Sequence, residues 1–257
     1  MTSRGILSRS TFTVSSRGRA ADTGSRFVGS LWTDRLAEVW AAPDHAGAGV
    51  VVGREGVLTA RHVVADALGG DRRGVLARVV RPGGSVAAWA PMRVEWEDGS
   101  WDLALLTLDR DSAEAALWEA PSSGEPVVVE LGVNVERHCE AVGFSESAVQ
   151  RTDTGAPADV VRQSEHAAGT VSPAGQAKRP VNPRRQLPRR WFPLDVVETT
   201  RPETQAGWGG MSGAGVVLPD GRLIGIIVTA ESESESESES EDEHRRLYLM
   251  PLADALS

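Results

Sequence analysis

The sequence consists largely of short apolar runs separated by turn-forming residues. Runs of Val, Ile, Leu and Ala are bounded by Gly, Pro and Asp at fairly even spacing, as in AGVVVG, DLALLTLD, EPVVVELG and RLIGIIVTA. Apolar runs of roughly four to eight residues are typical of buried strands and too short for most helices. Helix signals are few, chiefly DSAEAALWEA and the final LADALS. The pattern predicts an all-β protein, mainly an antiparallel sandwich or barrel, with a short C-terminal helix.

Chain length and cysteine content narrow the class further. With 257 residues the chain can form one large domain or two smaller ones around a substantial core. Its single cysteine, Cys139, excludes an intramolecular disulfide, which fits a reducing, cytoplasmic compartment. Cys139 is either a reactive thiol or a small buried residue, and its apolar neighbours favour the second. We expect no membrane association, because no run approaches the ~18 apolar residues of a span and the N-terminus lacks a signal-like apolar stretch.

Charge is distributed in separate runs. Residues 1–28 are rich in Ser, Arg and Gly, and we expect a flexible N-terminal segment there. The low-complexity run 231–243, ESESESESESEDE, holds eight acidic residues and so accounts for most of the net charge of -9. The run 178–190, KRPVNPRRQLPRR, holds six basic residues and none acidic. Its prolines and the absence of interleaved aromatic residues favour a surface loop over a nucleic-acid site.

Ser212 lies in the glycine-rich stretch GWGGMSGAG. A serine flanked by glycines is more often part of a turn than of an active site, because turns favour residues that tolerate positive φ. A nucleophilic serine also needs a general base, and the base needs an orienting acid. Ser212 is therefore a candidate nucleophile only if the chain supplies both partners.

Two residues upstream meet that requirement. His62 follows the apolar run GVLTA at the point where a predicted strand gives way to a helix-like turn. Asp102 directly precedes the apolar run LALLTL, where a carboxylate is costly unless it is hydrogen-bonded, and orienting an imidazole would satisfy it. Strand capping or a salt bridge are the alternative roles for Asp102. Asp98, four residues earlier in EWEDGS, is interpreted as a turn residue.

Taken in order, the three motifs resemble the trypsin-like (chymotrypsin-fold) serine proteases, in particular the disulfide-free bacterial branch similar to HtrA-type protease domains. GAGVVVGREGVLTARHVV is similar to the histidine block of that family, DLALLTLD to its aspartate block and GGMSGAGVVLPDGRLIGI to its serine block. The resemblance covers about residues 35–255. It implies a protease domain over 29–257 with two six-stranded antiparallel β-barrels, approximately 29–125 and 126–257, and an active site in the crevice between them.

The resemblance also implies roles for individual residues. In a serine endopeptidase of this type Ser212 would attack the scissile carbonyl of a protein or peptide, His62 would transfer the proton and Asp102 would hold the imidazole tautomer. The backbone N–H groups of Gly210 and Ser212 would form the oxyanion hole. The resemblance implies neither a metal nor a cofactor.

Three positions depart from the family pattern. Met211 stands where trypsin-type enzymes place an aspartate before the serine, so we do not expect activation by insertion of a newly cleaved N-terminus. Ala214 replaces the second glycine after the serine. Arg61 occupies a position that is usually small and apolar.

The resemblance assigns three residues to the primary specificity pocket. Ala206, six residues before the serine, would form its floor, and Val228 and Arg246 would contribute to its walls. A floor without a carboxylate disfavours cleavage after Lys or Arg. Arg246 would bind Asp or Glu, so cleavage after an acidic residue is our hypothesis, with small or apolar residues as the broader alternative. A one-residue shift in the alignment would turn Arg246 to the other face of its strand.

Several alternatives stay open. The acidic run 231–243 falls between the two strands that border the pocket, where it would be a solvated loop, a recruitment site for a basic partner or a pseudosubstrate. The whole chain could instead be a non-catalytic binding module that uses its charged loops. An α/β-hydrolase is disfavoured, because its acid and histidine would have to follow Ser212 within 45 residues. The C-terminal helix signal is compatible with a protease portion of a larger regulated protein, or with a separate activating or sensor partner.

Overall fold

A computed structural model describes twelve stretches of the chain, and every structural statement below concerns these residues. They are 12–15, 34–41, 45–69, 74–81, 87–121, 127–130, 135–151, 160–172, 191–198, 208, 210–228 and 246–256. The basic run 178–190 and the acidic run 231–243 lie outside them. So does the predicted flexible segment 1–28, apart from residues 12–15.

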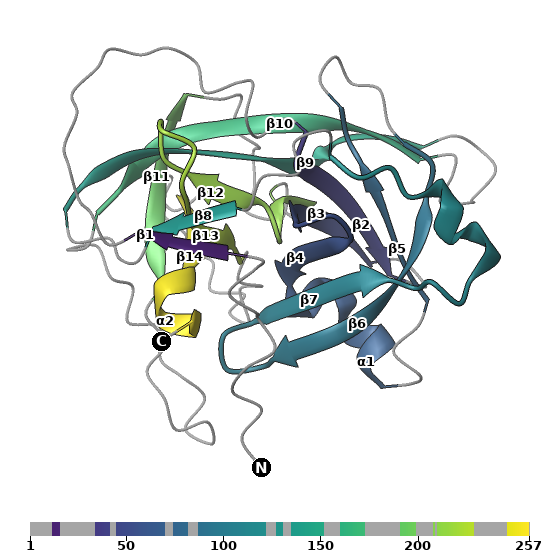
Figure 1. Cartoon of the computed structure of the whole chain (residues 1–257). Helices are drawn as coiled ribbons and strands as arrows, with labels where there is room; N and C mark the ends of the chain where they lie inside the picture. Colours follow the sequence, from purple (N-terminus) through teal and green to yellow (C-terminus); the bar gives the residue numbers. More distant parts are fainter. Residues whose placement is uncertain are drawn as a thin grey trace.

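The first half of the chain forms a closed barrel of six strands (Figure 1). Each strand pairs with antiparallel neighbours in the order β2-β3-β4-β7-β6-β5. The strands are β2 (Leu36–Ala41), β3 (His45–Val52), β4 (Gly56–Ala60), β5 (Val75–Val79), β6 (Ala90–Asp98) and β7 (Leu103–Leu108). Strands such as β4 and β7 are buried along most of their length, which explains their uninterrupted apolar runs.

The second half forms another six-stranded ring. Its order is β9-β10-β11-β14-β13-β12, and the ring closes because β13 pairs with both β12 and β14. The strands are β9 (Arg137–Arg151), β10 (Val160–Val171), β11 (Phe192–Glu198), β12 (Gly215–Val217), β13 (Leu223–Ile227) and β14 (Arg246–Pro251). The predicted architecture of two six-stranded antiparallel barrels is confirmed.

Two additional strands extend the second barrel in parallel orientation. β8 (Val127–Glu130) pairs with β13 through Val129 and Leu223, and β1 (Phe12–Ser15) pairs with β8 over four residues. The mainly antiparallel expectation did not include them. Strand β1 lies inside the segment 1–28, so four residues of that segment belong to the sheet; flexibility of the remainder stays a prediction.

The described helical elements are short. A 3₁₀ turn, η1 (Arg61–Val64), leads into α1 (Ala65–Leu68), and α2 (Leu252–Leu256) confirms the predicted C-terminal helix. The run DSAEAALWEA forms only the 3₁₀ turn η2 (Ala113–Leu117), which has no buried residue against which a longer helix would pack. In the parts of the chain that the model describes, no helix has the length and apolar character needed to cross a membrane.

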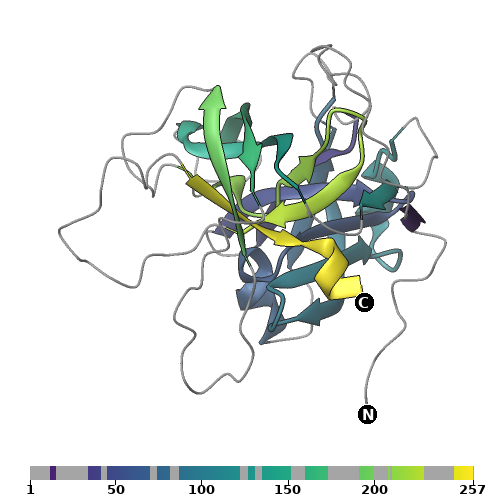
Figure 2. The ribbon, with the colours of Figure 1, turned by 90° about the vertical axis from the view of Figure 1, so that its left-hand side faces the viewer.

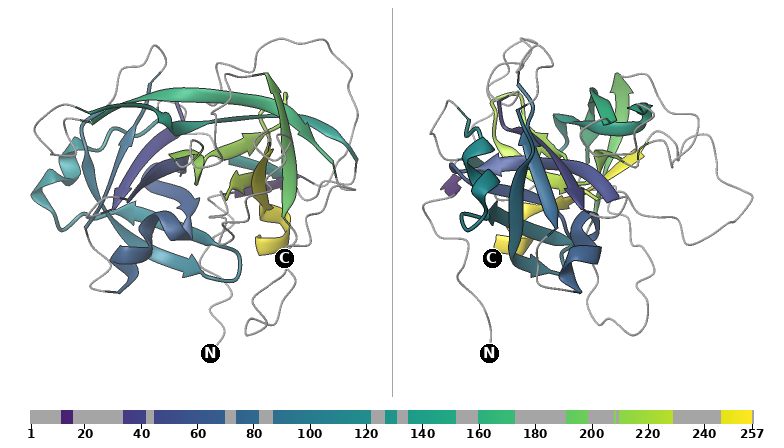
Figure 3. Two further views of the ribbon diagram at one scale, coloured as in Figure 1. Left: turned by 180° about the vertical axis from the view of Figure 1, so that it is seen from behind. Right: turned by 90° about the vertical axis from the view of Figure 1, so that its right-hand side faces the viewer.

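The two barrels are joined by packing as well as by the chain. The long strands β9 and β10 arch above both barrels (Figures 1 and 3), and β9 contacts β2 and β3. Figure 2 views the molecule from the side of the second barrel. Strand β14 continues there directly into helix α2. Apolar side chains of both halves share one buried cluster, to which Leu106 of the first barrel and Val217 and Ile226 of the second belong.

Cys139 lies on β9 inside the second barrel with no exposed surface. Burial raises the pKa of its thiol to about 12, although the nearby Arg137 acts in the opposite direction. Since the thiolate is the reactive form, the thiol is a packing group, in line with the interpretation that the sequence favoured.

We predict that Cys139 of the native protein does not react with iodoacetamide at about pH 8, because neither thiolate nor access is available. In denaturant the same thiol should alkylate fully, as mass spectrometry of the labelled chain would show. Alkylation of the native protein at the denatured rate would contradict the assigned burial.

Candidate active site

His62 and Asp102 are brought together by two paired strands of the first barrel. His62 follows β4 in the turn η1, and Asp102 directly precedes β7. Because Ala60 of β4 pairs with Leu103 of β7, the residues that follow and precede them emerge side by side. The predicted contact between His62 and Asp102 is therefore built on rigid strand ends.

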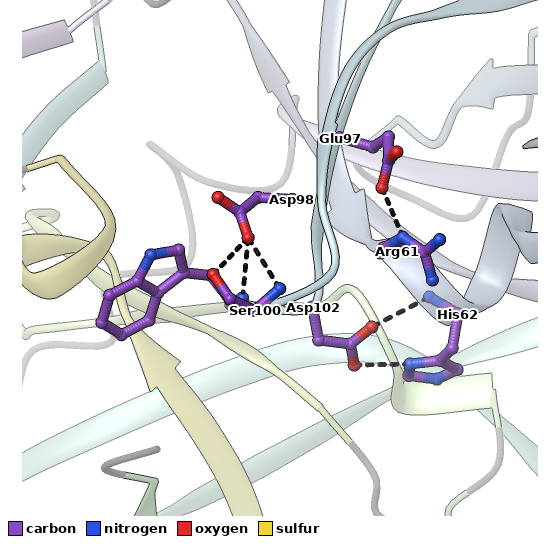
Figure 4. A network of polar contacts seen from close by, with 7 residues as sticks. Arg61, His62, Glu97, Asp98, Ser100 and Asp102 are labelled. Carbon is purple, nitrogen blue, oxygen red and sulfur yellow. Dashed lines mark hydrogen bonds and ion pairs between the residues drawn. The ribbon is translucent and has the colours of Figure 1, made fainter. Parts of the chain in front are cut away.

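The two residues make two hydrogen bonds. Nδ1 of His62 lies 2.8 Å from Oδ2 of Asp102, and the backbone N–H of His62 donates to Oδ1 at 3.0 Å (Figure 4). The carboxylate is the less exposed partner, with 17% of its side chain accessible against 40% for His62. Using both carboxylate oxygens fixes the ring orientation, and a proton on Nδ1 leaves Nε2 as the proton-accepting nitrogen.

The backbone at Asp102 adopts an unusual conformation. Its φ of +52° is the one positive value among the described residues other than glycine. Such a conformation costs on the order of 1 kcal/mol and persists only where the surroundings impose it. One such restraint is visible, because the N–H of Arg61 donates to the carbonyl of Asp102 at 2.9 Å.

Ser212 lies where the two barrels meet. Its carbonyl accepts a hydrogen bond of 2.7 Å from the N–H of Ala48 on β3, and only 2% of the residue is exposed. Gly47 makes this approach possible: a Cβ there would come within 2.7 Å of the Ser212 carbonyl and 2.8 Å of a methyl of Val63. Val63 directly follows His62, so the serine loop and the histidine turn both lie against Gly47.

Gly213 holds the serine loop in a sharp turn. Its φ is +90°, and its N–H donates to the carbonyl of Ile227 at 2.8 Å. A Cβ at this position would overlap the carbonyl oxygen of Ala48 and the hydroxyl of Thr59, which itself donates to Ala48 at 2.7 Å. Both the backbone angle and the available space therefore require glycine.

Met211 and Ala214, two of the departures from the family pattern, face the second barrel. Both are fully buried in its apolar cluster. A Cβ at Gly143 on β9 would lie 2.9 Å from the sulfur of Met211 and 2.9 Å from Cβ of Ala214. The loop is thus anchored by apolar packing at the position where trypsin-type enzymes carry a carboxylate.

The described residues contain both predicted oxyanion-hole residues but only part of the predicted pocket. Gly210 is buried in the turn before Ser212, and Val228 is fully buried, with its N–H donating to the carbonyl of Tyr248 at 2.8 Å. Ala206 and the side chain of Arg246 lie outside the described residues; the backbone of Arg246 pairs with Asp195 on β11. The roles assigned to Gly210, Ala206, Val228 and Arg246 stay predictions.

Polar groups around Asp102 add contacts that the motifs did not reveal. Arg61 pairs with Glu97 on β6, and Asp98 accepts hydrogen bonds within the turn that precedes Asp102 (Figure 4). In the sequence the only signals were the unusual Arg61 and the turn-forming EDGS. The described part of the chain brings together no group of three His, Cys, Asp or Glu side chains that would hold a metal ion.

Two closed antiparallel barrels that meet at the loop of Ser212 define the chymotrypsin-like fold class. A model of the trypsin-like peptidase domain matches residues 47–226, more than half of the chain. The chain belongs to this family and is a serine protease, as the sequence motifs predicted. No curated protein matches the chain.

Solved structures share the fold at low sequence identity. The inactive form of the Rv3671c protease is 14% identical with a TM-score of 0.52, covering 88% of this chain and 86% of that one. Deg5 is 16% identical with a TM-score of 0.54, covering 87% and 86%. The active form of the Rv3671c protease from M. tuberculosis is 15% identical with a TM-score of 0.50, covering 86% and 77%. At these identities the similarity concerns the fold.

We predict that Gly213→Ala destabilises the protein by about 2 kcal/mol or more, because a methyl group there collides with Ala48 and Thr59 in addition to disfavouring the backbone angle. Gly53→Ala is the matched control: Gly53 also has a positive φ, +66°, but a Cβ there meets nothing within 4 Å. Gly53→Ala should cost only about 1 kcal/mol. Denaturant unfolding of both variants measures the difference, and equal losses would contradict the crowding at the barrel junction.

Proposed function

We propose that this serine protease is an endopeptidase that hydrolyses peptide bonds through Ser212, His62 and Asp102. The observation that carries the proposal is the double hydrogen bond between His62 and Asp102. A carboxylate that uses both oxygens on one histidine orients that imidazole, which general-base catalysis requires. The carbonyl of Ser212 is bound by Ala48 on β3, next to Gly47, and Val63 of the histidine turn lies against the same Gly47.

The reaction follows from these groups. Nε2 of His62 takes the proton of the Ser212 hydroxyl while Oγ attacks the carbonyl carbon of the substrate, and Asp102 stabilises the resulting imidazolium. The backbone N–H groups of Gly210 and Ser212 would receive the oxyanion, each contributing about 3 kcal/mol to transition-state stabilisation. His62 then donates its proton to the leaving amine. Water, activated by the same imidazole, hydrolyses the acyl-enzyme and regenerates Ser212.

We predict that a fluorophosphonate probe labels Ser212 of the intact chain. Ser212→Ala should abolish labelling, and Asp102→Asn should slow it by about ten-thousand-fold, because the amide would favour the wrong imidazole tautomer. Mass spectrometry of the labelled peptide identifies the modified residue. Failure of the wild-type chain to label, with or without added peptide substrate, would favour the alternative of a non-catalytic binding module.

The proposed substrate preference rests on the pocket residues. In the pocket hypothesis the buried Val228 would form an apolar wall. Its backbone bond to Tyr248 joins the two strands that flank the run 231–243. Arg246 begins the second of these strands. We therefore propose cleavage after acidic residues or, failing that, after small apolar ones, in protein or peptide substrates.

We predict that a positional peptide library yields cleavage after Asp or Glu, and that Arg246→Ala shifts the preference toward small apolar residues. The arginine supplies the positive charge in this pocket hypothesis, so its removal leaves the apolar wall to select. Arg222→Ala is the control. Arg222 lies in the β12–β13 hairpin and forms ion pairs with Asp220 of the same hairpin and with Glu130 of β8. Strong cleavage after Lys or Arg would contradict both versions of the preference.

A further inference from the structure

We propose that Arg61, Glu97 and Asp98 are positioning residues that hold Asp102 in the conformation in which it orients His62. This inference rests on the proposed function of the His62–Asp102 pair. Arg61 binds Glu97 on one side of the turn that carries Asp102, and Asp98 fixes the interior of that turn (Figure 4). On the other side, the backbone N–H of Arg61 donates to the carbonyl of Asp102.

The turn between β6 and β7 is fixed by a single carboxylate oxygen. Oδ1 of Asp98 accepts hydrogen bonds from the N–H of Ser100 at 2.7 Å, from the N–H of Trp101 at 3.2 Å and from the Ser100 hydroxyl. Asp98 is the last residue of β6 and pairs with Leu103, the first of β7. Its carboxylate therefore organises the backbone up to the residue immediately before Asp102.

Arg61 spans the base of the same turn. On one side its Nε donates to Oε2 of Glu97, which belongs to β6. On the other side its backbone N–H donates to the carbonyl of Asp102. The guanidinium also lies over the turn, because a Cβ built on Gly99 would be 3.5 Å from Nε of Arg61. The β6 strand and Asp102 are thus tied to one residue.

The position of Arg61 in the chain couples this restraint to the histidine. Arg61 directly precedes His62, so a displacement of Arg61 moves both ends of the His62–Asp102 contact. Asp102 resists such a displacement poorly by itself, since its φ of +52° is intrinsically unfavourable and relaxation would redirect its carboxylate. Asp98 and Glu97 supply the restraint that keeps Asp102 at this backbone angle.

If Arg61, Glu97 and Asp98 served only to stabilise the fold, their removal would have a different effect. Partly exposed ion pairs contribute about 1 kcal/mol or less to stability, and removing one would leave the reaction rate unchanged. The chain contains such a pair in Arg110 and Glu55, which join through bonds of 2.9 and 2.7 Å. Arg110→Ala is therefore the matched control for loss of an arginine–glutamate pair away from the turn.

The test compares variants that remove or keep each restraint. Asp98→Ala, Glu97→Ala and Arg61→Ala should each slow Ser212 labelling by about ten- to a hundredfold, because small displacements of catalytic groups have effects of that size. Asp98→Asn keeps the accepting oxygen and should restore most of the rate. Arg110→Ala should label like the parent. With a cleaved peptide as substrate, the loss should fall on kcat and leave KM unchanged.

A second measurement does not depend on activity. In a Ser212→Ala background, the hydrogen-bonded Nδ1 proton of His62 should give a protected NMR signal that is lost in Asp98→Ala and kept in Asp98→Asn and Arg110→Ala. If Asp98→Ala fails to fold, Glu97→Ala and Arg61→Ala decide the question in both measurements.

The outcomes separate the two proposals. Labelling within twofold of the parent in all three alanine variants, with the His62 signal intact, would overturn the positioning role. Absence of labelling in the parent would overturn the proposed function instead, and the NMR comparison would still show whether these residues hold Asp102.

Discussion

The contact between the serine loop and strand β3 is the constraint on which the site depends. At this point the carbonyl of Ser212 and the backbone of Gly213 lie directly against the backbone of Ala48. Gly47 and Gly213 make the approach possible from opposite sides. This backbone contact leaves Ser212 little freedom to shift relative to β3. The turn that carries His62 packs against Gly47 as well. The position of the proposed nucleophile is therefore set by the packing of whole barrels.

The positions of Asp102 and His62 depend on a different feature, the pairing of strand β4 with strand β7. Both residues stand just outside paired strand ends, so the barrel fixes their separation, while local hydrogen bonds determine their orientation. This division explains why polar side chains gather around the β6–β7 turn. Strand pairing alone would allow Asp102 to relax to a negative φ. Arg61, Glu97 and Asp98 surround the one described non-glycine residue whose backbone needs support.

Much of this arrangement could be predicted from the sequence, because its signals are local. Short apolar runs predicted the strands of both barrels, and the order of the His62, Asp102 and Ser212 motifs predicted the family. Contacts set by tertiary structure were not predictable in the same way. Strand β1 arises in a polar segment and is specified by its partner β8, and the ion pair of Arg61 joins residues 36 positions apart. The helical signal near Ala113 gave only a 3₁₀ turn, because propensity alone does not sustain a helix that buries nothing.

The apolar packing of Met211 determines how the stability of the serine loop responds to solution conditions. A loop held by a carboxylate and an amine would respond chiefly to pH and ionic strength, which act on the two charges. The anchor of this loop is a thioether in an apolar cluster with Cys139 and Phe144. Attachment of that kind depends on apolar hydration and carries a heat-capacity change, so its strength declines on cooling and is nearly indifferent to salt screening. The packing that holds the serine loop therefore depends on temperature more than on proton concentration.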